Sequence, residues 1–113
     1  MLTATLAITA AMSLVTGMAA EAGVDPGLAC HIVELESGWD QFAIGDYHMP
    51  TPSAGPWQFQ KEAWEYGRQS MGLSDASVLR FNWVESTRTA LWLIANGRGE
   101  WWSTWEEASC QSG

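Results

Sequence analysis

Residues 25–39 read DPGLACHIVELESGW and predict the best-defined helix of the chain. Asp25 is suited to the N-cap, and Pro26 suits the first helical position because its missing N–H would have no helical partner there. Gly38 can take the left-handed conformation that ends many helices. The pattern therefore predicts a helix from residue 26 to about Glu36.

One acidic side chain of this helix falls on its apolar face. At about 100° per residue, Glu36 projects into the apolar arc, whereas Glu34 projects to the opposite side, towards solvent. The arc consists of Leu28, Ala29, Ile32, Val33 and Leu35. Burial raises the pKa of a carboxyl group, and an acid that stays protonated can donate its proton to a glycosidic oxygen. Glu36 is therefore the candidate catalytic acid; the alternative is a helix-end residue that turns out to water.

A segment rich in glycine and proline follows, over residues 37–56. We expect a long loop or a small hairpin here, and a loop of this length in a small domain is usually functional. Its glycines, Gly38 and Gly45, allow the backbone to approach a ligand closely. Tyr47, Ser53 and Gln58 offer neutral groups that suit the hydroxyl and N-acetyl groups of a sugar. Alternatively, Gln58 is an ordinary polar residue in the first turn of the next helix.

Three further helices are expected after this segment. The second begins near Pro56 and ends before Gly72, the third runs from a cap at residues 74–75 to residues 96–97, and the fourth covers about residues 100–109. A chain of 113 residues is one domain. We predict a mainly α fold, a compact bundle of about four to five helices with the loop or hairpin after the candidate catalytic helix.

The first twenty residues carry no charge and are mostly apolar or small. They are typical of a signal peptide cleaved near Ala19 or Ala20, although they lack a positively charged start. The alternative is a short first helix of the folded domain. A stable membrane span is not expected, because the stretch is rich in Ala and Thr and has no anchoring charges. The first interpretation predicts a secreted, periplasmic, cell-envelope or phage-associated protein with its domain over residues 21–113.

The two cysteines, Cys30 and Cys110, lie near the ends of that domain. A disulfide between them would close a loop of roughly 80 residues and contribute about 4 kcal/mol in the loop-entropy description. Such a bridge suits a small secreted domain, and the alternative is two unpaired buried thiols. His31 and His48 are too few and too badly spaced to form a metal site with Cys30, so we expect neither a metal nor another cofactor.

The charge balance is strongly acidic, with a net charge of −8. The five basic residues are scattered, so the chain offers no basic patch that could displace counterions from nucleic acid, and nucleic acid is not an expected partner. An acidic surface also repels an anionic polymer unless neutral contacts or salt compensate. We expect a monomer.

Eight tryptophans are unusual in so short a chain. Packing between helices is the expected role of Trp64, Trp83 and Trp92, because each indole buries a large area. The cluster of Trp101, Trp102 and Trp105 cannot all face inward from one helical turn. At least one of these three indoles should be exposed, where it could stack on a sugar ring.

The order of several short motifs is similar to that of a known family. Residues 23–26 (GVDP), 28–29 (LA) and 36–40 (ESGWD) resemble the opening of the soluble lytic transglycosylase domain, which shares the goose-type lysozyme fold. Residues 55–58 (GPWQ) agree in two of four letters with the family's Gly-Leu-Met-Gln motif. The resemblance implies a lysozyme-like α+β fold in which Glu36 is the catalytic acid/base and the glutamine lines the substrate groove.

The later part of the chain carries less of the family pattern. Residues 90–92 (ALW) and 99–101 (GEW), with Trp105 beyond them, are similar to the end of short phage and bacterial members. The third family motif, Tyr-Asn-Ala-Gly, is represented only by residues 95–97 (ANG), and no tyrosine precedes the asparagine. The resemblance covers roughly residues 20–108.

The resemblance implies a lytic transglycosylase that cleaves peptidoglycan glycan strands between N-acetylmuramic acid and N-acetylglucosamine. Glu36 would protonate the glycosidic oxygen and then accept a proton from the sugar's own 6-hydroxyl, giving a 1,6-anhydro product. The substrate-binding residues that we expect are Ser37, Tyr47, Ser53, Gly55, Trp57, Gln58, Asn96 and Trp101.

Several other functions stay open at this point. A muramidase or chitinase-like hydrolase would need a second carboxylate, about 5 Å away for retention or about 6.5–9.5 Å for inversion. Asp46 is the better candidate and Asp40 the other, although a turn-forming aspartate is an alternative role for Asp46. A non-catalytic sugar-binding module would use the tryptophans but not Glu36. A structural secreted protein would use neither.

Overall fold

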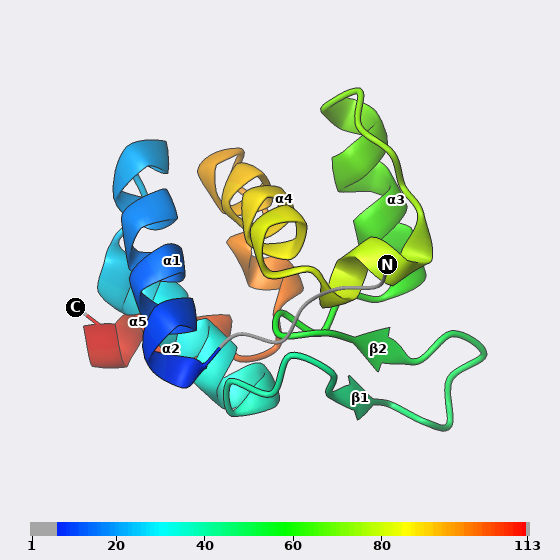
Figure 1. Ribbon diagram of the computed structural model, residues 1–113, viewed down its shortest axis with the longest axis horizontal. Helices are drawn as coiled ribbons and strands as arrows, with labels where there is room; N and C mark the ends of the chain where they lie inside the picture. Colours follow the sequence, from blue (N-terminus) through cyan, green and yellow to red (C-terminus); the bar gives the residue numbers. More distant parts are fainter. Residues whose placement is uncertain (1–6, 113) are drawn as a thin grey trace.

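The computed structural model describes residues 7–112, with the side chains of residues 7–108. Within these residues the chain forms five α-helices, two short 3-10 helices and a two-stranded sheet (Figure 1). In chain order the elements are α1 (Ile8–Ala22), α2 (Pro26–Ser37), β1 (Ile44–Gly45), β2 (Ser53–Ala54), α3 (Lys61–Ser70), η1 (Ser77–Phe81), α4 (Trp83–Ala95), η2 (Gly99–Trp101) and α5 (Trp105–Ser112). The predicted mainly α bundle, with a small hairpin after the candidate catalytic helix, is confirmed.

Helix α2 begins and ends where its sequence predicts. The side chain of Asp25 accepts a hydrogen bond of 3.0 Å from the backbone N–H of Gly27, which satisfies one free donor of the first turn. Gly38 closes the helix in the left-handed conformation, with φ of 60°. The buried face holds Ile32 and Val33, both fully inaccessible. Helix α2 packs against α1 on one side and α5 on another, so it occupies the middle of this part of the bundle.

Residues 8–22 form a helix of the bundle, coloured blue in Figure 1. Ala11, Val15 and Ala19 recur every fourth residue and are fully buried where α1 packs against α2 and α4. The domain boundary expected at residue 20 therefore lies inside a helix. Cleavage near Ala19 stays a prediction, and it would remove this buried face from the core.

The segment after α2 contains the small hairpin. Ile44 pairs with Ala54 and Gly45 with Ser53 in antiparallel register. The chain then turns tightly and Phe59 bridges back to Ala54. This arrangement directs one end of the hairpin towards the bundle, while its outer turn projects away from the helices (Figure 1).

Gly55 and Arg80 fix the hairpin against η1. Gly55 has φ of 85°, and a Cβ there would collide with the backbone carbonyl oxygen of Arg80, so only glycine fits. The guanidinium of Arg80 is buried and donates to the carbonyl oxygens of Pro52 and Phe59 at 3.1 and 2.9 Å. Gly55 therefore serves backbone packing, which corrects its expected role in substrate binding.

The predicted start of the second helix is wrong by about five residues. Helix α3 begins at Lys61 rather than near Pro56, because Gly55 and Gln58 both have positive φ and form a tight turn instead. Pro56 suits a turn as well as a first helical position, and the sequence pattern does not separate the two roles.

The predicted start of the third helix is also wrong. Ser74 and Asp75 precede a separate 3-10 helix, η1, and α4 begins only at Trp83. Asn82 is the N-cap, and its side chain accepts a hydrogen bond of 3.0 Å from the backbone N–H of Glu85. The predicted end is close, since α4 ends at Ala95. The expected fourth helix is likewise split, into η2 and α5.

An aromatic cluster fills the core between α3, α4 and the hairpin. Trp57 is fully buried, and its indole N–H donates to the hydroxyl of Thr87 at 3.0 Å. Phe59 packs edge-on against Trp64 and Trp102, with ring centroids 5.1 and 5.5 Å apart. Trp57 is thus a core residue, which corrects its expected role as a sugar-binding residue.

The structure contains no disulfide at Cys30, whose thiol is free. Its sulfur lies 3.5 Å from the hydroxyl oxygen of Thr16, at the interface between α2 and α1. The side chain of Cys110 lies outside the described residues. The prediction of a disulfide from Cys30 is therefore wrong, and the free thiol packs between α2 and α1 instead.

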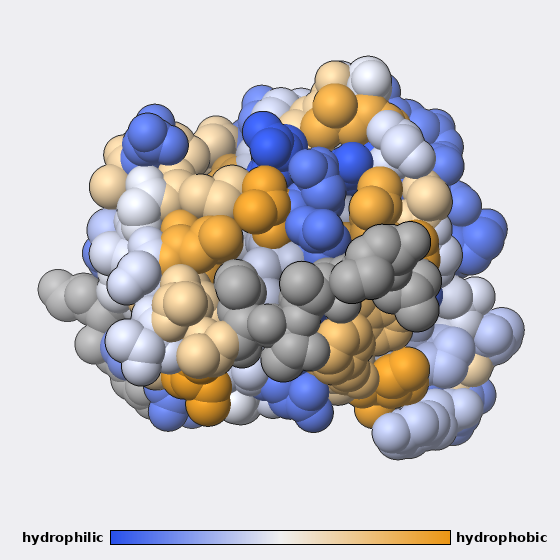
Figure 2. Space-filling view, in the orientation of Figure 1, coloured by the Kyte–Doolittle hydropathy of each residue, from blue (hydrophilic) through white to orange (hydrophobic). Residues whose placement is uncertain are grey.

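The outer face of the bundle is predominantly polar between α4 and α3, where Figure 2 shows a hydrophilic patch. The ion pair of Arg68 and Glu85, at 2.8 Å, joins these two helices. Arg88 on α4 lies 3.4 Å from the same carboxylate.

None of the helices within residues 7–112 combines the length and apolar character needed to cross a membrane.

Candidate active site

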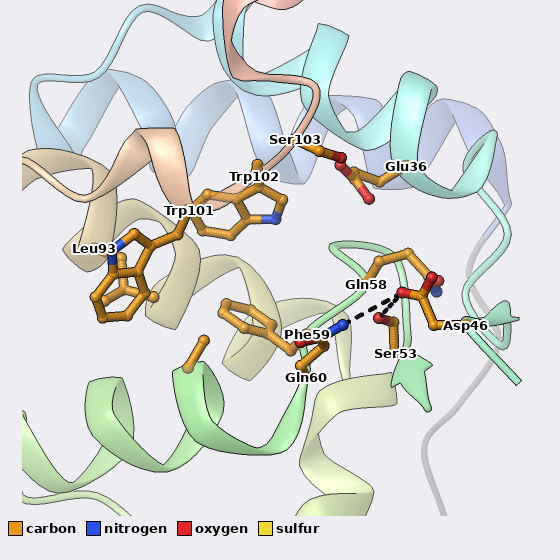
Figure 3. Close-up of a pocket in the computed structure, with 11 residues that line it drawn as sticks. Glu36, Asp46, Ser53, Gln58, Phe59, Gln60, Leu93, Trp101, Trp102 and Ser103 are labelled. Carbon is orange, nitrogen blue, oxygen red and sulfur yellow. Dashed lines mark hydrogen bonds between the residues drawn. The ribbon is translucent and has the colours of Figure 1, made fainter. Parts of the chain in front are cut away.

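A surface pocket of about 320 Å³ lies between the end of α2, the hairpin, the start of α3 and η2 (Figure 3). Its size is at the lower end of the range of about 300–1,000 Å³ that is usual for small-molecule sites. The pocket is lined by Glu36, Asp46, Ser53, Gln58, Phe59, Gln60, Ala63, Leu93, Trp101, Trp102 and Ser103. Five of the sequence-predicted site residues are therefore brought together: Glu36, Asp46, Ser53, Gln58 and Trp101.

Glu36 projects from the last turn of α2 into this pocket and is partly buried. The hydroxyl of Thr104 donates a hydrogen bond of 2.7 Å to its carboxyl oxygen Oε2. Burial raises the pKa of Glu36 above its usual value of 4.5, the Thr104 hydroxyl opposes this rise, and the negative charge of Asp46 adds to it. The predicted position on the apolar face is confirmed, as is the exposure of Glu34.

Asp46 enters the same pocket from the hairpin, directly after β1. The Ser53 hydroxyl donates to Asp46 Oδ2 at 2.6 Å, and the Gln60 amide donates to the same oxygen at 3.4 Å (Figure 3). The hydrogen bond from Ser53 is the largest cause that lowers the pKa of Asp46. Asp46 is exposed to solvent. Its backbone has the left-handed conformation, with φ of 55°.

The two carboxyl groups therefore have pKa values that are shifted in opposite directions within one pocket. Glu36 retains its proton to higher pH than a free glutamate, whereas Asp46 is ionised at lower pH than a free aspartate. Such a pair can supply a proton donor and a permanent anion at the same pH.

Gln58 lines the pocket, but its amide is already engaged. Its Nε2 donates to the carbonyl oxygens of Ala43 and Gly55, at 3.0 and 2.9 Å. A Cβ on Gly45 would collide with the side-chain oxygen Oε1 of Gln58. This glycine therefore makes room for the glutamine rather than for a ligand. Gln58 thus holds the hairpin in place and offers only its side-chain oxygen to a ligand.

The opposite wall of the pocket is aromatic. The Trp101 side chain is 49% exposed, which confirms that at least one indole of the C-terminal cluster is accessible. Trp102 is 7% exposed and its indole N–H donates to the carbonyl oxygen of Trp57 at 2.8 Å, so it is anchored in the core. Trp101 is therefore the side chain in this wall that can stack on a sugar ring.

Three other expected binding residues lie outside the pocket lining. The Ser37 hydroxyl donates to the carbonyl oxygen of Val33 within α2, at 3.1 Å. Tyr47 is 78% exposed in the outer turn of the hairpin. The Asn96 amide donates to the carbonyl oxygen of Trp92 at the end of α4, at 2.8 Å. Ser37 and Asn96 thus donate hydrogen bonds to nearby backbone carbonyl oxygens, and Tyr47 faces solvent.

Several residues of the site were missed by the sequence analysis. Thr104 is the most important, because it is the direct partner of Glu36 across 68 positions of the chain. Gln60 donates a hydrogen bond to Asp46, and Phe59 and Leu93 contribute apolar surface to the pocket lining. Gln60 follows Gln58 by two residues and could have been noticed, whereas nothing in the spacing of Thr104 points to Glu36.

Among the described side chains, no group of three or more His, Cys, Asp or Glu could hold a metal ion. Comparison with known proteins gives no match: no protein-family model, curated protein or solved structure matches the chain. The assignment of function therefore depends on the pocket itself.

Proposed function

We propose that this protein is a glycan-cleaving enzyme, a lytic transglycosylase that acts on the β-1,4 bond between N-acetylmuramic acid and N-acetylglucosamine in peptidoglycan. The observation that carries the proposal is the partly buried, hydrogen-bonded Glu36 with its raised pKa inside an open pocket. A secreted or cell-envelope location belongs to the same proposal, because the substrate lies outside the cytoplasm.

In the first step Glu36 donates its proton to the glycosidic oxygen as the bond from that oxygen to the anomeric carbon breaks. The ionised Glu36 then accepts the proton of the sugar's 6-hydroxyl while the hydroxyl oxygen bonds to the anomeric carbon. The product is a 1,6-anhydro sugar, and Glu36 ends the cycle protonated. The hydrogen bond from Thr104 favours the ionised form of Glu36 that exists between the two steps.

A hydrolytic reaction is a second candidate, and the position of Asp46 in the pocket favours it. An ionised Asp46 could activate a water molecule or form a bond to the anomeric carbon, as the second carboxylate of a hydrolase does. The elements of water would then appear in the product. A muramidase and a chitinase-like hydrolase would both use this arrangement.

Mass spectrometry of products from digested cell-wall sacculi tests the proposal. We expect anhydro products, which are lighter than hydrolytic products by one water molecule, from the unmodified chain. No product is expected from the Glu36→Gln variant. Reducing-end sugars would instead favour the hydrolase. Binding of sacculi without any cleavage by the unmodified chain would favour a sugar-binding module.

A further inference from the structure

Trp101, which lines the pocket, belongs to a surface cluster of two aromatic rings and one partly buried cation. The rings of Tyr66 on α3 and Trp101 on η2 meet edge-on, with centroids 5.4 Å apart. The guanidinium of Arg98 lies over both rings, 5.0 Å from the Tyr66 centroid and 5.7 Å from the Trp101 centroid. We call these three residues the outer cluster.

Local backbone geometry places the outer cluster beside the pocket. The backbone N–H of Trp101 donates to the carbonyl oxygen of Arg98 at 3.1 Å, and side chains three residues apart in such a turn lie over each other. On α3, Tyr66 is three residues after Ala63, so the two share a helix face. Ala63 and Trp101 both line the pocket, so the outer cluster extends the same wall.

Arg98 differs from the other cations of the chain in its partners. It forms no ion pair with any of the described residues, and its guanidinium donates a hydrogen bond to the carbonyl oxygen of Asn96, at 2.9 Å. The other cations are engaged: Lys61 with Glu65, Arg68 and Arg88 with Glu85, and Arg80 with backbone carbonyls. A guanidinium has five N–H donors, so most of those on Arg98 stay available.

The chemistry of this cluster fits a carboxylate attached to a sugar. An aromatic face accepts the apolar face of a sugar ring, and a guanidinium that is held by two rings can donate two parallel hydrogen bonds to a carboxylate. A neutral polymer would gain nothing from the charge of Arg98. On a chain with a net charge of −8, an unpaired cation beside the pocket gives an anionic group a local attraction.

We propose that Tyr66, Arg98 and Trp101 form an outer subsite that binds a carboxylate-bearing unit of the glycan. The inference rests on the proposed function, and it assigns the residues that recognise the acidic groups of that substrate. In peptidoglycan those groups are the carboxylates of the lactyl group of N-acetylmuramic acid or of its attached peptide.

Calorimetric binding to two matched probes tests the subsite. The first probe is a tetrasaccharide of alternating N-acetylglucosamine and N-acetylmuramic acid with free lactyl carboxylates, and the second is the same tetrasaccharide with those carboxyls converted to neutral amides. The full chain carries Glu36→Gln so that neither probe is cleaved. We expect the charged probe to bind about tenfold more tightly, as one hydrogen-bonded charge contact allows.

The variant Arg98→Gln should remove this preference while leaving affinity for the amide probe within about twofold, since the difference between the probes lies in the charge contact. Arg88→Gln is the control: it removes the same charge from a side chain that is 49% exposed, is paired with Glu85 and lies outside the pocket lining. Arg88→Gln should keep the full preference. Arg98→Lys retains the charge and should keep part of the preference. Trp101→Ala should weaken binding of both probes.

Equal binding of the two probes by the parent chain would overturn the subsite, as would an Arg98→Gln variant that keeps the preference. These outcomes are separable from failure of the proposed function. If a chain with intact Glu36 cleaves sacculi while the probes bind equally, only the subsite is wrong. If the charge preference is present but the unmodified chain produces no cleavage, the site binds anionic glycans without acting on them.

Discussion

The two sides of the pocket hold their carboxyl groups in different ways. Glu36 lies in the last turn of α2, is partly buried, and accepts a hydrogen bond from the hydroxyl of Thr104, directly before α5. Asp46 lies at the end of a two-residue strand and is exposed, with Ser53 and Gln60 as its partners. The helix provides burial and the hairpin provides hydrogen bonds. The same functional group therefore becomes a proton donor on one side and an anion on the other.

The largest expected effect comes from Glu36→Gln. The amide cannot donate or accept the proton, so cleavage of sacculi should fall by at least the roughly 10²–10⁴-fold that general acid catalysis contributes. A turbidity assay with product analysis measures this loss. Glu34→Gln, an exposed change two residues earlier in α2, is the control and should retain activity. Comparable loss in both variants would show that the helix, rather than the carboxyl group, is required.

The stability of the unmodified chain should depend on pH through Glu36, and that of the Glu36→Gln variant should not. The pKa of Glu36 is higher in the folded chain than the usual 4.5, so the folded chain loses stability as pH rises from about 4.5 through the raised value. Glu36→Gln lacks this loss and should gain Tm relative to the unmodified chain at neutral pH. Thermal melts from pH 4 to pH 8, as a rough range, measure the difference. A constant difference across that range would contradict the raised pKa.

Asp46→Asn tests whether the carboxyl group on the hairpin side of the pocket takes part in the reaction. If the anhydro mechanism holds, the variant should retain activity to within about tenfold, less than a general base contributes. Its pH profile should still change: burial keeps the pKa of Glu36 raised, but the contribution from the charge of Asp46 is lost. The alkaline limb, where Glu36 loses its proton, should move to lower pH. A loss of 10²-fold or more would instead make Asp46 the second carboxylate of a hydrolase.

Thr104→Val should move the same limb in the opposite direction. The hydroxyl favours the ionised form of Glu36, so without it the pKa of Glu36 should rise further and activity should persist to higher pH. The loss of one hydrogen bond should also lower the free energy of unfolding by about 1 kcal/mol. Rate measurements across the alkaline limb, with Ser103→Ala as the neighbouring control, test this. A shift to lower pH would exclude Thr104 as the partner of the acid.

The smallest effect is expected from Ser53→Ala on the hairpin side. The hydroxyl of Ser53 is the main cause of the lowered pKa of Asp46, so its removal should return that pKa towards the usual 3.8. Titration of the Asp46 carboxyl by NMR measures the change. The alkaline limb of the activity profile should stay in place, because the hairpin changes the pKa of Glu36 only through the charge of Asp46, and that charge is still present at neutral pH. A moved alkaline limb would mean that the hairpin itself has shifted.

Local sequence determined helix α2 and the position of its acid. Asp25, Pro26 and Gly38 fix the two ends of the helix through short-range hydrogen bonds and allowed backbone angles, and these signals act within a few residues. The face that carries Glu36 follows from the helical period alone. A long loop or small hairpin was also predicted from the glycines and prolines, as was the exposure of at least one indole in the C-terminal cluster.

Only the tertiary structure decided which groups meet that acid. Thr104 reaches Glu36 across 68 positions, and Arg98 meets Tyr66 across the gap between two elements, so no local pattern records either contact. Trp57 was misassigned because a buried and an exposed indole have the same sequence signal. The burial of an indole or a carboxyl group depends on which distant elements pack around it, and this packing sets the pKa and the chemistry of the pocket.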